Sequence, residues 1–317
     1  MIRRVLLAAL LAAAPTVQAQ EYPSRPIKIV APFPSGGSAD VIPRIIGEKL
    51  SLKWGQPVIV ENRAGAAGNI GAEYVFKAEP DGYTLLSSPP PPLIINPSLY
   101  RNLPFDPMQF VPIGIMVAIP NVVLVNPRVP VNSIRELIAY AKANPDKLNY
   151  ASQGSGTTSH LTGEMFKSMA GVRLTHIPYK GSAPALTDLL AGQVEMMFDN
   201  LGVSRQHVVS GKLKLLAVCS EKRVASLPEV PALAEILPGF EAVAWFGMVA
   251  PPKTPMPIAE KISAAVAEVL KLPDVRKRLA DLSAEAIGST PAEMAAFMKK
   301  DAERWRGVIR SAGVKAD

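Results

Sequence analysis

The chain is poor in cysteine and histidine, and both shortages narrow its chemistry. Its 317 residues include one cysteine, Cys219, and three histidines, His160, His176 and His207. One thiol cannot form an internal disulfide, and Cys219 continues an apolar run, so we expect it to be buried in the core. The histidines are not spaced like metal ligands. We therefore expect no metal site and no cofactor.

Motifs for nucleotide binding and for hydrolysis are also missing. The sequence has no G-x-S-x-G, no G-x-G-x-x-G after a strand and no Walker pattern. A hydrolase in which Ser155 or Ser159 works with His160 is an alternative. Neighbours on a helix point apart, however, so Ser159 and His160 cannot readily pair. The sequence favours a binding protein over an enzyme.

The charged residues form no basic stripe. Lysine and arginine outnumber aspartate and glutamate by 34 to 27, but the cations are scattered or alternate with acids, as in residues 271–281. Such a distribution is typical of solvated helix faces, and we expect no nucleic-acid partner. A mildly basic average is compatible with small anions as ligands.

The first 19 residues are typical of a secretory signal peptide. Two arginines precede the apolar run Val5–Ala14, and the small-residue site Val17-Gln18-Ala19 follows it. The run is too short for a membrane span, which needs about 20 apolar residues. We expect cleavage after residue 19 and a periplasmic mature protein; an uncleaved anchor is the alternative.

Beyond the signal peptide, short strands rich in Val, Leu and Ile alternate with helices. The clearest run has strands at 148–151, 174–177, 194–198 and 213–218, with helices at 159–170, 183–191 and 204–210 between them. This alternation predicts an α/β fold with mostly parallel sheets and helices on both faces. The length predicts two lobes: residues 22–124 with 246–317, and residues 125–245.

Local signals place several boundaries. Capping boxes predict helices that begin after Ser133 and after Thr290. A strand is expected at 121–125. Four consecutive prolines in Ser88–Pro92 remove backbone donors, so we expect an extended loop there.

The stretch Ala151–Leu161 is the strongest candidate for a ligand site. Hydroxyl residues and glycines crowd here between a predicted strand and a predicted helix, whose first amides would attract an anion. A simple turn with an N-cap is the alternative. Ligands of open α/β sheets bind at the carboxyl ends of strands, which adds the loops 31–40, 87–96, 178–184 and 199–204.

Three side chains in these loops have two open interpretations each. Asp199 could accept a ligand's amino or hydroxyl group, or cap the next helix. Lys180 could contact an anion or remain solvated, and Phe33 could pack on ligand or core.

The chain resembles the Bug/TctC family of periplasmic solute-binding proteins, which serve tripartite tricarboxylate transporters. The resemblance covers nearly all residues after the signal peptide. It is carried by these stretches, in this order: YPSRPIKIVAPFPSGGSAD, VENRAGAAGNIGAEYVFKAEPDGYTLL, INPSLYRNLPFDP, NYASQGSGTTSHL, HIPYKGSAPALTDLLAGQVEMMFDN and WFGMVAPPKTP.

The resemblance implies a two-lobed Venus-flytrap fold of type II-like architecture. Such a protein captures a small carboxylate between its lobes and delivers it to a membrane permease, without catalysis and as a monomer by default. A ligand sensor that signals to a membrane receptor is the alternative. The ligand-binding residues carried over are Phe33, Ser35, Gly36, Gly37, Asp40, Ser152, Gly154, Ser155, Gly156, Thr157, Ser159 and Asp199.

Two departures from the family bear on selectivity. Ser35 stands where the family commonly has a second proline, and Ser88–Pro92 replaces a polar segment that usually lines the pocket. Because proline donates no N–H, we expect apolar surface and Ser87 or Ser88 at the distal end of the ligand. This favours an aromatic, aliphatic or amino-acid-like carboxylate over citrate.

Overall fold

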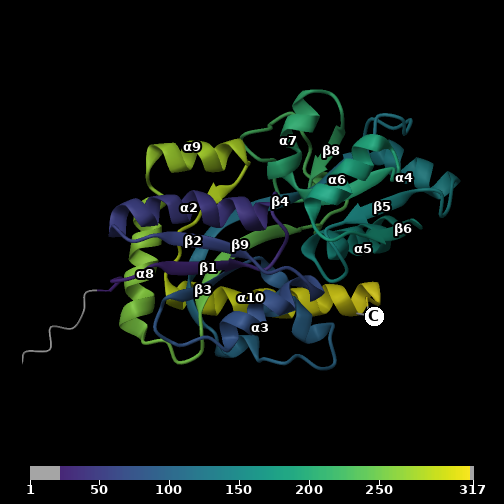
Figure 1. Cartoon of the computed structure of the whole chain (residues 1–317). Helices are drawn as coiled ribbons and strands as arrows, with labels where there is room; N and C mark the ends of the chain where they lie inside the picture. The colour runs from purple at the N-terminus through teal and green to yellow at the C-terminus, as the bar shows by residue number, and fades with distance from the viewer. Residues whose placement is uncertain (1–21, 315–317) are drawn as a thin grey trace, which may run out of the picture.

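The computed structural model describes residues 22–314, so the predicted signal peptide lies outside the described part (Figure 1). The strands are β1 (Ile27–Ala31), β2 (Val58–Asn62), β3 (Thr84–Ser88), β4 (Val111–Val125), β5 (Asn149–Ser152), β6 (Thr175–Pro178), β7 (Met196–Asn200), β8 (Lys214–Val218), β9 (Val243–Ala250) and β10 (Glu285–Ala286). The helices are α2 (Ser38–Trp54), α3 (Asn69–Phe76), α4 (Ile134–Ala143), α5 (Thr158–Ala170), α6 (Ser182–Ala191), α7 (Leu201–Val209), α8 (Met256–Val269), α9 (Pro273–Asp281) and α10 (Pro291–Ala312).

The strands form a mixed sheet in the order β2-β1-β3-β9-β4-β7-β5-β6, and β8 and β10 also pair with β4. Strand β1 is parallel to β2 and β3, and β5 is parallel to β6 and β7. Every strand that pairs with β4 is antiparallel to it. The α/β class is confirmed, but the pairing is mixed because β4 and β9 cross the middle of the sheet without crossover helices.

Strand β4 divides the sheet into two halves. Residues 111–120 pair with β9, whereas residues 121–125 pair with β7 and β8. The chain returns beside this point, since Cys219 N donates to Asn121 O (2.7 Å) and Asn121 N donates to Ala242 O (3.0 Å). We call the part with β1, β2, β3 and β9 the first half, and the part with β5–β8 the second half. The exact lobe boundaries proposed from the sequence stay a prediction.

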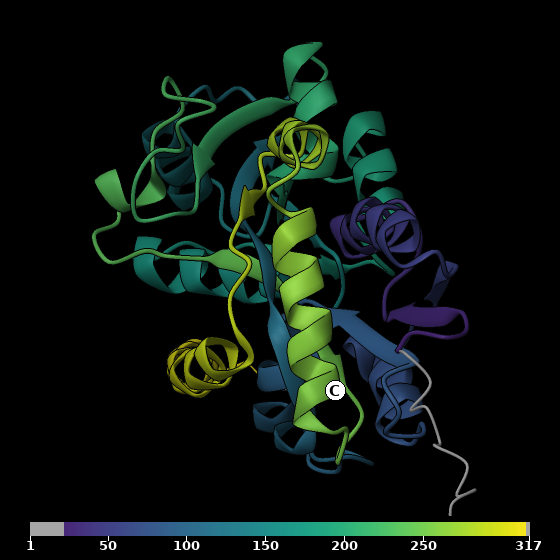
Figure 2. The ribbon, with the colours of Figure 1, turned by 90° about the vertical axis from the view of Figure 1, so that its left-hand side faces the viewer.

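Helices cover the sheet and join its halves (Figures 1 and 2). Helix α2 packs against α8 and α9 on one side of the first half, while α10 runs along β4 and also contacts α5 of the second half. The indole of Trp245 in β9 donates to Asp301 Oδ2 at 2.8 Å and holds α10 on β9. Within α10, the indole of Trp305 donates to the same oxygen at 3.2 Å. The predicted caps are present, as Ser133 Oγ and Thr290 Oγ1 accept amides of their helices.

The prediction of an extended proline loop is wrong. Pro90 has helical angles (φ −52°, ψ −35°). The π-helical turn η2 (Pro91–Ile95) follows it and is buried. The first amides of a helix need no partner within it, so prolines fit there without losing a hydrogen bond.

Candidate functional site

The loops that follow β1, β5, β6 and β7 meet between the two halves of the sheet and enclose two hollows. The inner hollow has a volume of about 20 Å³, and the outer hollow about 490 Å³. Both are lined by Phe33, Pro34, Gln153 and Gly181. The inner hollow is also lined by Gly37, Ser38, Ala39, Pro89, Ser182, Asn200 and Phe246.

Three helices begin at the inner hollow, and their N-termini have no side-chain cap. Their N-cap residues are Gly37 for α2, Gly181 for α6 and Asn200 for α7, and none of these makes a side-chain capping bond. The first two helix ends come from opposite halves and almost touch, since a Cβ on Gly37 would lie 3.7 Å from Ser182 Oγ. Open first-turn amides and helix dipoles together favour an anion at this point.

Of the two hydroxyls at the inner hollow, that of Ser38 is a free donor and that of Ser182 is already engaged. Ser38 is 2% exposed, and its buried Oγ has no hydrogen-bond partner. Ser182 Oγ donates to Asp199 Oδ1 at 3.0 Å. A buried hydroxyl without a partner destabilises the folded protein, so a hydrogen bond between Ser38 Oγ and a polar ligand group would be favourable.

The Ala151–Leu161 stretch forms the β5–α5 loop, but most of its hydroxyls have partners inside that loop. Ser152 Oγ accepts from Gly154 N (3.1 Å), and Ser159 Oγ accepts from Gln153 N (2.9 Å). Thr157 is the N-cap of α5, and its Oγ1 donates to Gly154 O at 2.6 Å. Helix α5 is therefore capped by its own chain, unlike α2, α6 and α7.

Two histidines support this loop from behind. His160 Nδ1 accepts from Gly156 N at 3.1 Å, and its ring stacks on His176 with 4.0 Å between centroids. His176 Nε2 lies 2.7 Å from Ser152 Oγ, and burial lowers the pKa of His176 to about 3. His160 therefore holds the backbone of the β5–α5 loop in place.

Of the β5–α5 loop residues predicted to bind ligand, Gly154 and Ser155 line the outer hollow. Gly156 packs against the first half, because a Cβ there would lie 3.0 Å from Leu99 Cδ1. Ser152, Thr157 and Ser159 are buried behind the loop surface. The stretch thus forms one wall of the outer hollow.

In the β1–α2 loop, Phe33 lines both hollows and Gly37 lines the inner one. Ser35 and Gly36 are exposed and line neither. Asp40 braces the loop, accepting from Gly36 N (3.0 Å) and Arg44 Nε (2.8 Å). Burial opposes ionisation of Asp40, but these hydrogen bonds outweigh burial and hold its pKa below the usual value.

The proline segment contributes Pro89 rather than Ser88. Ser88 is fully buried, lines neither hollow, and donates through Oγ to Pro89 O at 2.9 Å. Ser87 Oγ is buried without a partner. Pro89 itself lines the inner hollow and presents no N–H there.

Asp199 lies directly behind the inner hollow without lining it. It is fully buried, and its Oδ1 accepts from Gln153 Nε2 (2.5 Å), Asn200 N (2.8 Å) and Ser182 Oγ (3.0 Å). Its Oδ2 has no partner. Burial is the largest influence and raises the pKa of Asp199 to about 6.

Sequence reasoning missed a strained turn in the outer wall. Four consecutive residues have positive φ: Gly65 (138°), Ala66 (47°), Ala67 (50°) and Gly68 (92°). Alanine in this region costs about 1–2 kcal/mol, and Asn96 Nδ2 supports the turn by donating to Ala67 O at 3.2 Å. Gly65 and Gly68 are the signal in the sequence that could have indicated this turn.

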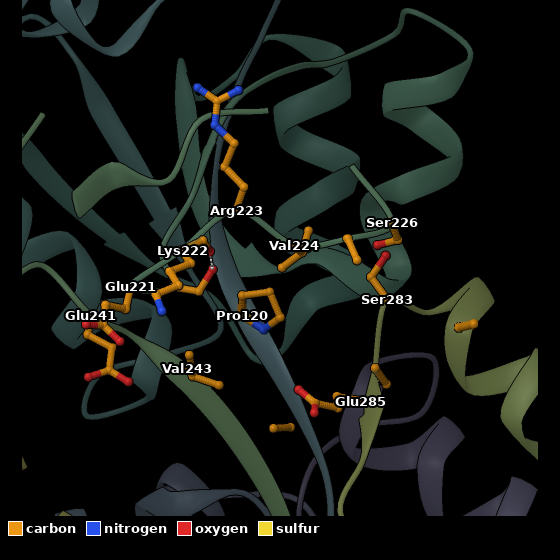
Figure 3. Close-up of a pocket in the computed structure, with 15 residues that line it drawn as sticks. Pro120, Glu221, Lys222, Arg223, Val224, Ser226, Glu241, Val243, Ser283 and Glu285 are labelled. Carbon is orange, nitrogen blue, oxygen red and sulfur yellow. Dashed lines mark hydrogen bonds between the residues drawn. The ribbon is translucent and has the colours of Figure 1, made fainter. Parts of the chain in front are cut away.

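A third hollow of about 510 Å³ lies where the chain crosses between the halves, and it shares no lining residue with the other two (Figure 3). Pro120 and Val243 form its floor, and acids such as Glu285 are mixed with Lys222 and Arg223 around it. Arg223 is already paired with Glu235 at 2.7 Å. Mixed charge and the lack of a helix N-terminus among its lining residues make this hollow a poor anion site.

Within residues 22–314, no cluster of three or more His, Cys, Asp or Glu residues could hold a metal ion. No helix in this range is long and apolar enough to cross a membrane. The candidate site consists of backbone amides, hydroxyls, the side-chain amides of Gln153 and Asn200, apolar side chains and Lys180.

The two sheet halves with a crossing strand and a cleft between their loops define the class of two-lobed solute-binding proteins. A family model described as "Tripartite tricarboxylate transporter family receptor" matches residues 42–314. Protein BugT of Bordetella pertussis is 38% identical over 302 residues, covering 94% of this chain and 93% of BugT. The chain belongs to this receptor family, as the resemblance predicted.

Solved structures support the same assignment. Rpa4515 of R. palustris with adipate is similar with a TM-score of 0.91 at 37% identity, covering 93% of this chain and 99% of that one. MatC (Rpa3494) of Rhodopseudomonas palustris with bound malate is similar with a TM-score of 0.86 at 32% identity, covering 91% and 100%. The fold is thus that of a periplasmic binding protein.

Proposed function

We propose that this protein captures a small carboxylate in the periplasm and delivers it to the permease of a tripartite tricarboxylate transporter. The observation that carries the proposal is the convergence of three uncapped helix N-termini on one hollow, beside the unpartnered Oγ of Ser38. The family supports the permease as the partner, and the similarity to Rpa4515 with adipate and MatC with malate supports carboxylates as ligands.

The two hollows suggest which part of the ligand each of them binds. One carboxylate occupies the inner hollow, where the first-turn amides of α2 and α6 and the hydroxyl of Ser38 act as donors. The inner hollow has room for about one water, so the loops must move slightly apart to admit the group. The rest of the ligand lies in the outer hollow, whose volume suits a small organic acid.

The outer hollow favours acids with an apolar body. Phe33, Pro34, Tyr100 and Pro178 line it, and Lys180 is the one charged residue among its described lining residues. Lys180 is exposed at this wall, where it would lie near a second carboxylate. We therefore expect aliphatic dicarboxylates and aromatic monocarboxylates to bind better than citrate.

Thermal unfolding tests the proposal. Protein refolded from denaturant, and shown by native mass spectrometry to be ligand-free, is heated with adipate, malate, benzoate or citrate. A ligand that binds only the folded state adds RT ln(1 + [L]/Kd), about 2.7 kcal/mol at 100 times Kd. We expect at least one of the first three acids to raise Tm. Failure of every acid at millimolar concentration would contradict carboxylate capture.

A further inference from the structure

The inner hollow is backed by a carboxyl group in an unusual position. When ionised, Asp199 places a negative charge directly behind a site whose helix N-termini favour an anion. Ser182 and Gln153 both line the inner hollow and both donate to Asp199 Oδ1. An anion in the hollow is thus separated from Asp199 by one layer of side chains.

The geometry leaves Asp199 without a direct role in ligand contact. Its side chain is 0% exposed and does not line the inner or the outer hollow. Gln153 Nε2, Ser182 Oγ and Asn200 N all donate to Oδ1, and Oδ2 is buried without a partner. A carboxylate with one unsatisfied buried oxygen is the form that desolvation penalises, so Oδ2 is the natural position for a proton.

Resting on the proposed function, we propose that Asp199 takes up one proton from solvent when a carboxylate enters the inner hollow. The ligand's charge disfavours the ionised form of Asp199, since like charges in a buried site cannot both ionise at low cost. Protonation of Oδ2 removes this repulsion and leaves the hydrogen bonds to Oδ1 in place. Asp199 is therefore a positioning residue that acts through Ser182 and Gln153, and it couples capture to pH.

Neighbouring charges do not supply an alternative counterion. Strand β7 packs against β4, β5, α5, α6 and α7. Within the described residues, six titratable side chains on these elements have no hydrogen bond or ion pair to Asp199: Tyr150, Glu164, Lys167, Asp188, Arg205 and His207. His160, on α5, accepts from Gly156 N and stacks on His176. In the free protein, burial is the largest cause of the raised pKa of Asp199, and the hydrogen bonds to Oδ1 oppose it.

The sign of the pH dependence follows from linkage. Binding raises a pKa that is already about 6 in the free protein. Below pH 6 Asp199 is protonated with or without ligand, so it adds no pH dependence there. Between pH 6 and the higher pKa of the complex, Kd rises about tenfold per pH unit, because one proton enters with each ligand.

Isothermal titration calorimetry tests the coupling. The best binder among adipate, malate and benzoate is titrated at pH 7 in phosphate, imidazole and Tris, whose ionisation enthalpies differ. The slope of binding enthalpy against buffer ionisation enthalpy counts the protons taken up. We expect about one proton per ligand for the wild-type protein, a measurement that needs no variant.

Asp199→Asn is the isosteric variant, and Asp281→Asn is its control, because Asp281 is an exposed acid on α9. Asp199→Asn should take up no proton and should bind at pH 8 at least as tightly as at pH 6, whereas Asp281→Asn should behave like wild type. Wild-type binding without proton uptake, or unchanged uptake in Asp199→Asn, would overturn this inference and leave carboxylate capture intact. Absence of binding heat with all three acids would overturn the proposed function itself.

Discussion

Helices α5 and α2, which both begin at the cleft, differ in how their first amides are satisfied. Helix α5 begins at a loop rich in hydroxyls, and Thr157 caps it. Helix α2 begins at Gly37, which has no side chain to cap it, and Ser38 Oγ lacks a partner. Hydroxyl content alone therefore does not mark an anion site. Donors that the fold leaves unused mark it better.

The largest expected effect comes from giving α2 the cap that it lacks. Gly37 has φ −93° and ψ 171°, which any residue adopts. Gly37→Asp should stabilise the fold by roughly a few tenths of a kcal/mol through capping, while its carboxylate occupies the inner hollow and repels the ligand. We expect affinity to fall by roughly 100-fold, at a cost of about 2.7 kcal/mol, measured by calorimetry. Gly307→Asp, at an exposed position of α10 with open space around it, is the control.

Ser38→Ala should separate binding from stability. Ser38 Oγ has no partner in the protein, so its loss should leave Tm nearly unchanged. A hydrogen bond to a charged group contributes about 1.5–3 kcal/mol, and Kd should rise by the corresponding factor, roughly 10–150-fold. Ser283→Ala removes another unpartnered buried hydroxyl, at the third hollow, and should leave Kd unchanged. Equal Kd values for both variants would remove Ser38 from the site.

Thr157→Ala should show the opposite pattern. It removes the N-cap of α5 and the 2.6 Å bond to Gly154 O. We expect a loss of about 1 kcal/mol in the free energy of unfolding, measured by urea denaturation, with Kd changed less than about threefold, or about 0.6 kcal/mol. A loss of affinity that exceeds the loss of stability would show that this hydroxyl meets the ligand.

The smallest effect is expected at Ser155, which lines the outer hollow. If the carboxylate lies at α2 and α6, Ser155→Ala should raise Kd by less than about threefold, because the hydroxyl touches only the body of the ligand. A rise in Kd of tenfold or more would indicate that the carboxylate binds at the β5–α5 loop and not at α2 and α6.

Much of the fold was predictable because each element carries its own pattern. The alternation through residues 148–218 places β5–β8 and α5–α7 within a few residues of their observed bounds. Strand β4 was predicted only at 121–125, because Pro112 and Pro120 locally oppose a strand. Pairing with β9 overrides that preference, with register shifts beside Pro112.

The site was predictable to the level of its loops. The rule that ligands bind at strand ends selected the loops that contain Phe33, Gly37 and Ser155, which line the hollows. The same rule covered the loop of Ser182, although that residue was not singled out. Whether a hydroxyl already has a hydrogen-bond partner or is free to bind a ligand depends on contacts between residues far apart in the sequence. A sequence pattern does not show these contacts.

A crystal structure of the protein with its best-binding carboxylate tests the central claim most directly. We expect a carboxylate in the inner hollow, with its oxygens about 3 Å from Ser38 Oγ or from the first-turn amides of α2 and α6. A carboxylate bound instead at the N-terminus of α5, against Ser155, would contradict the account.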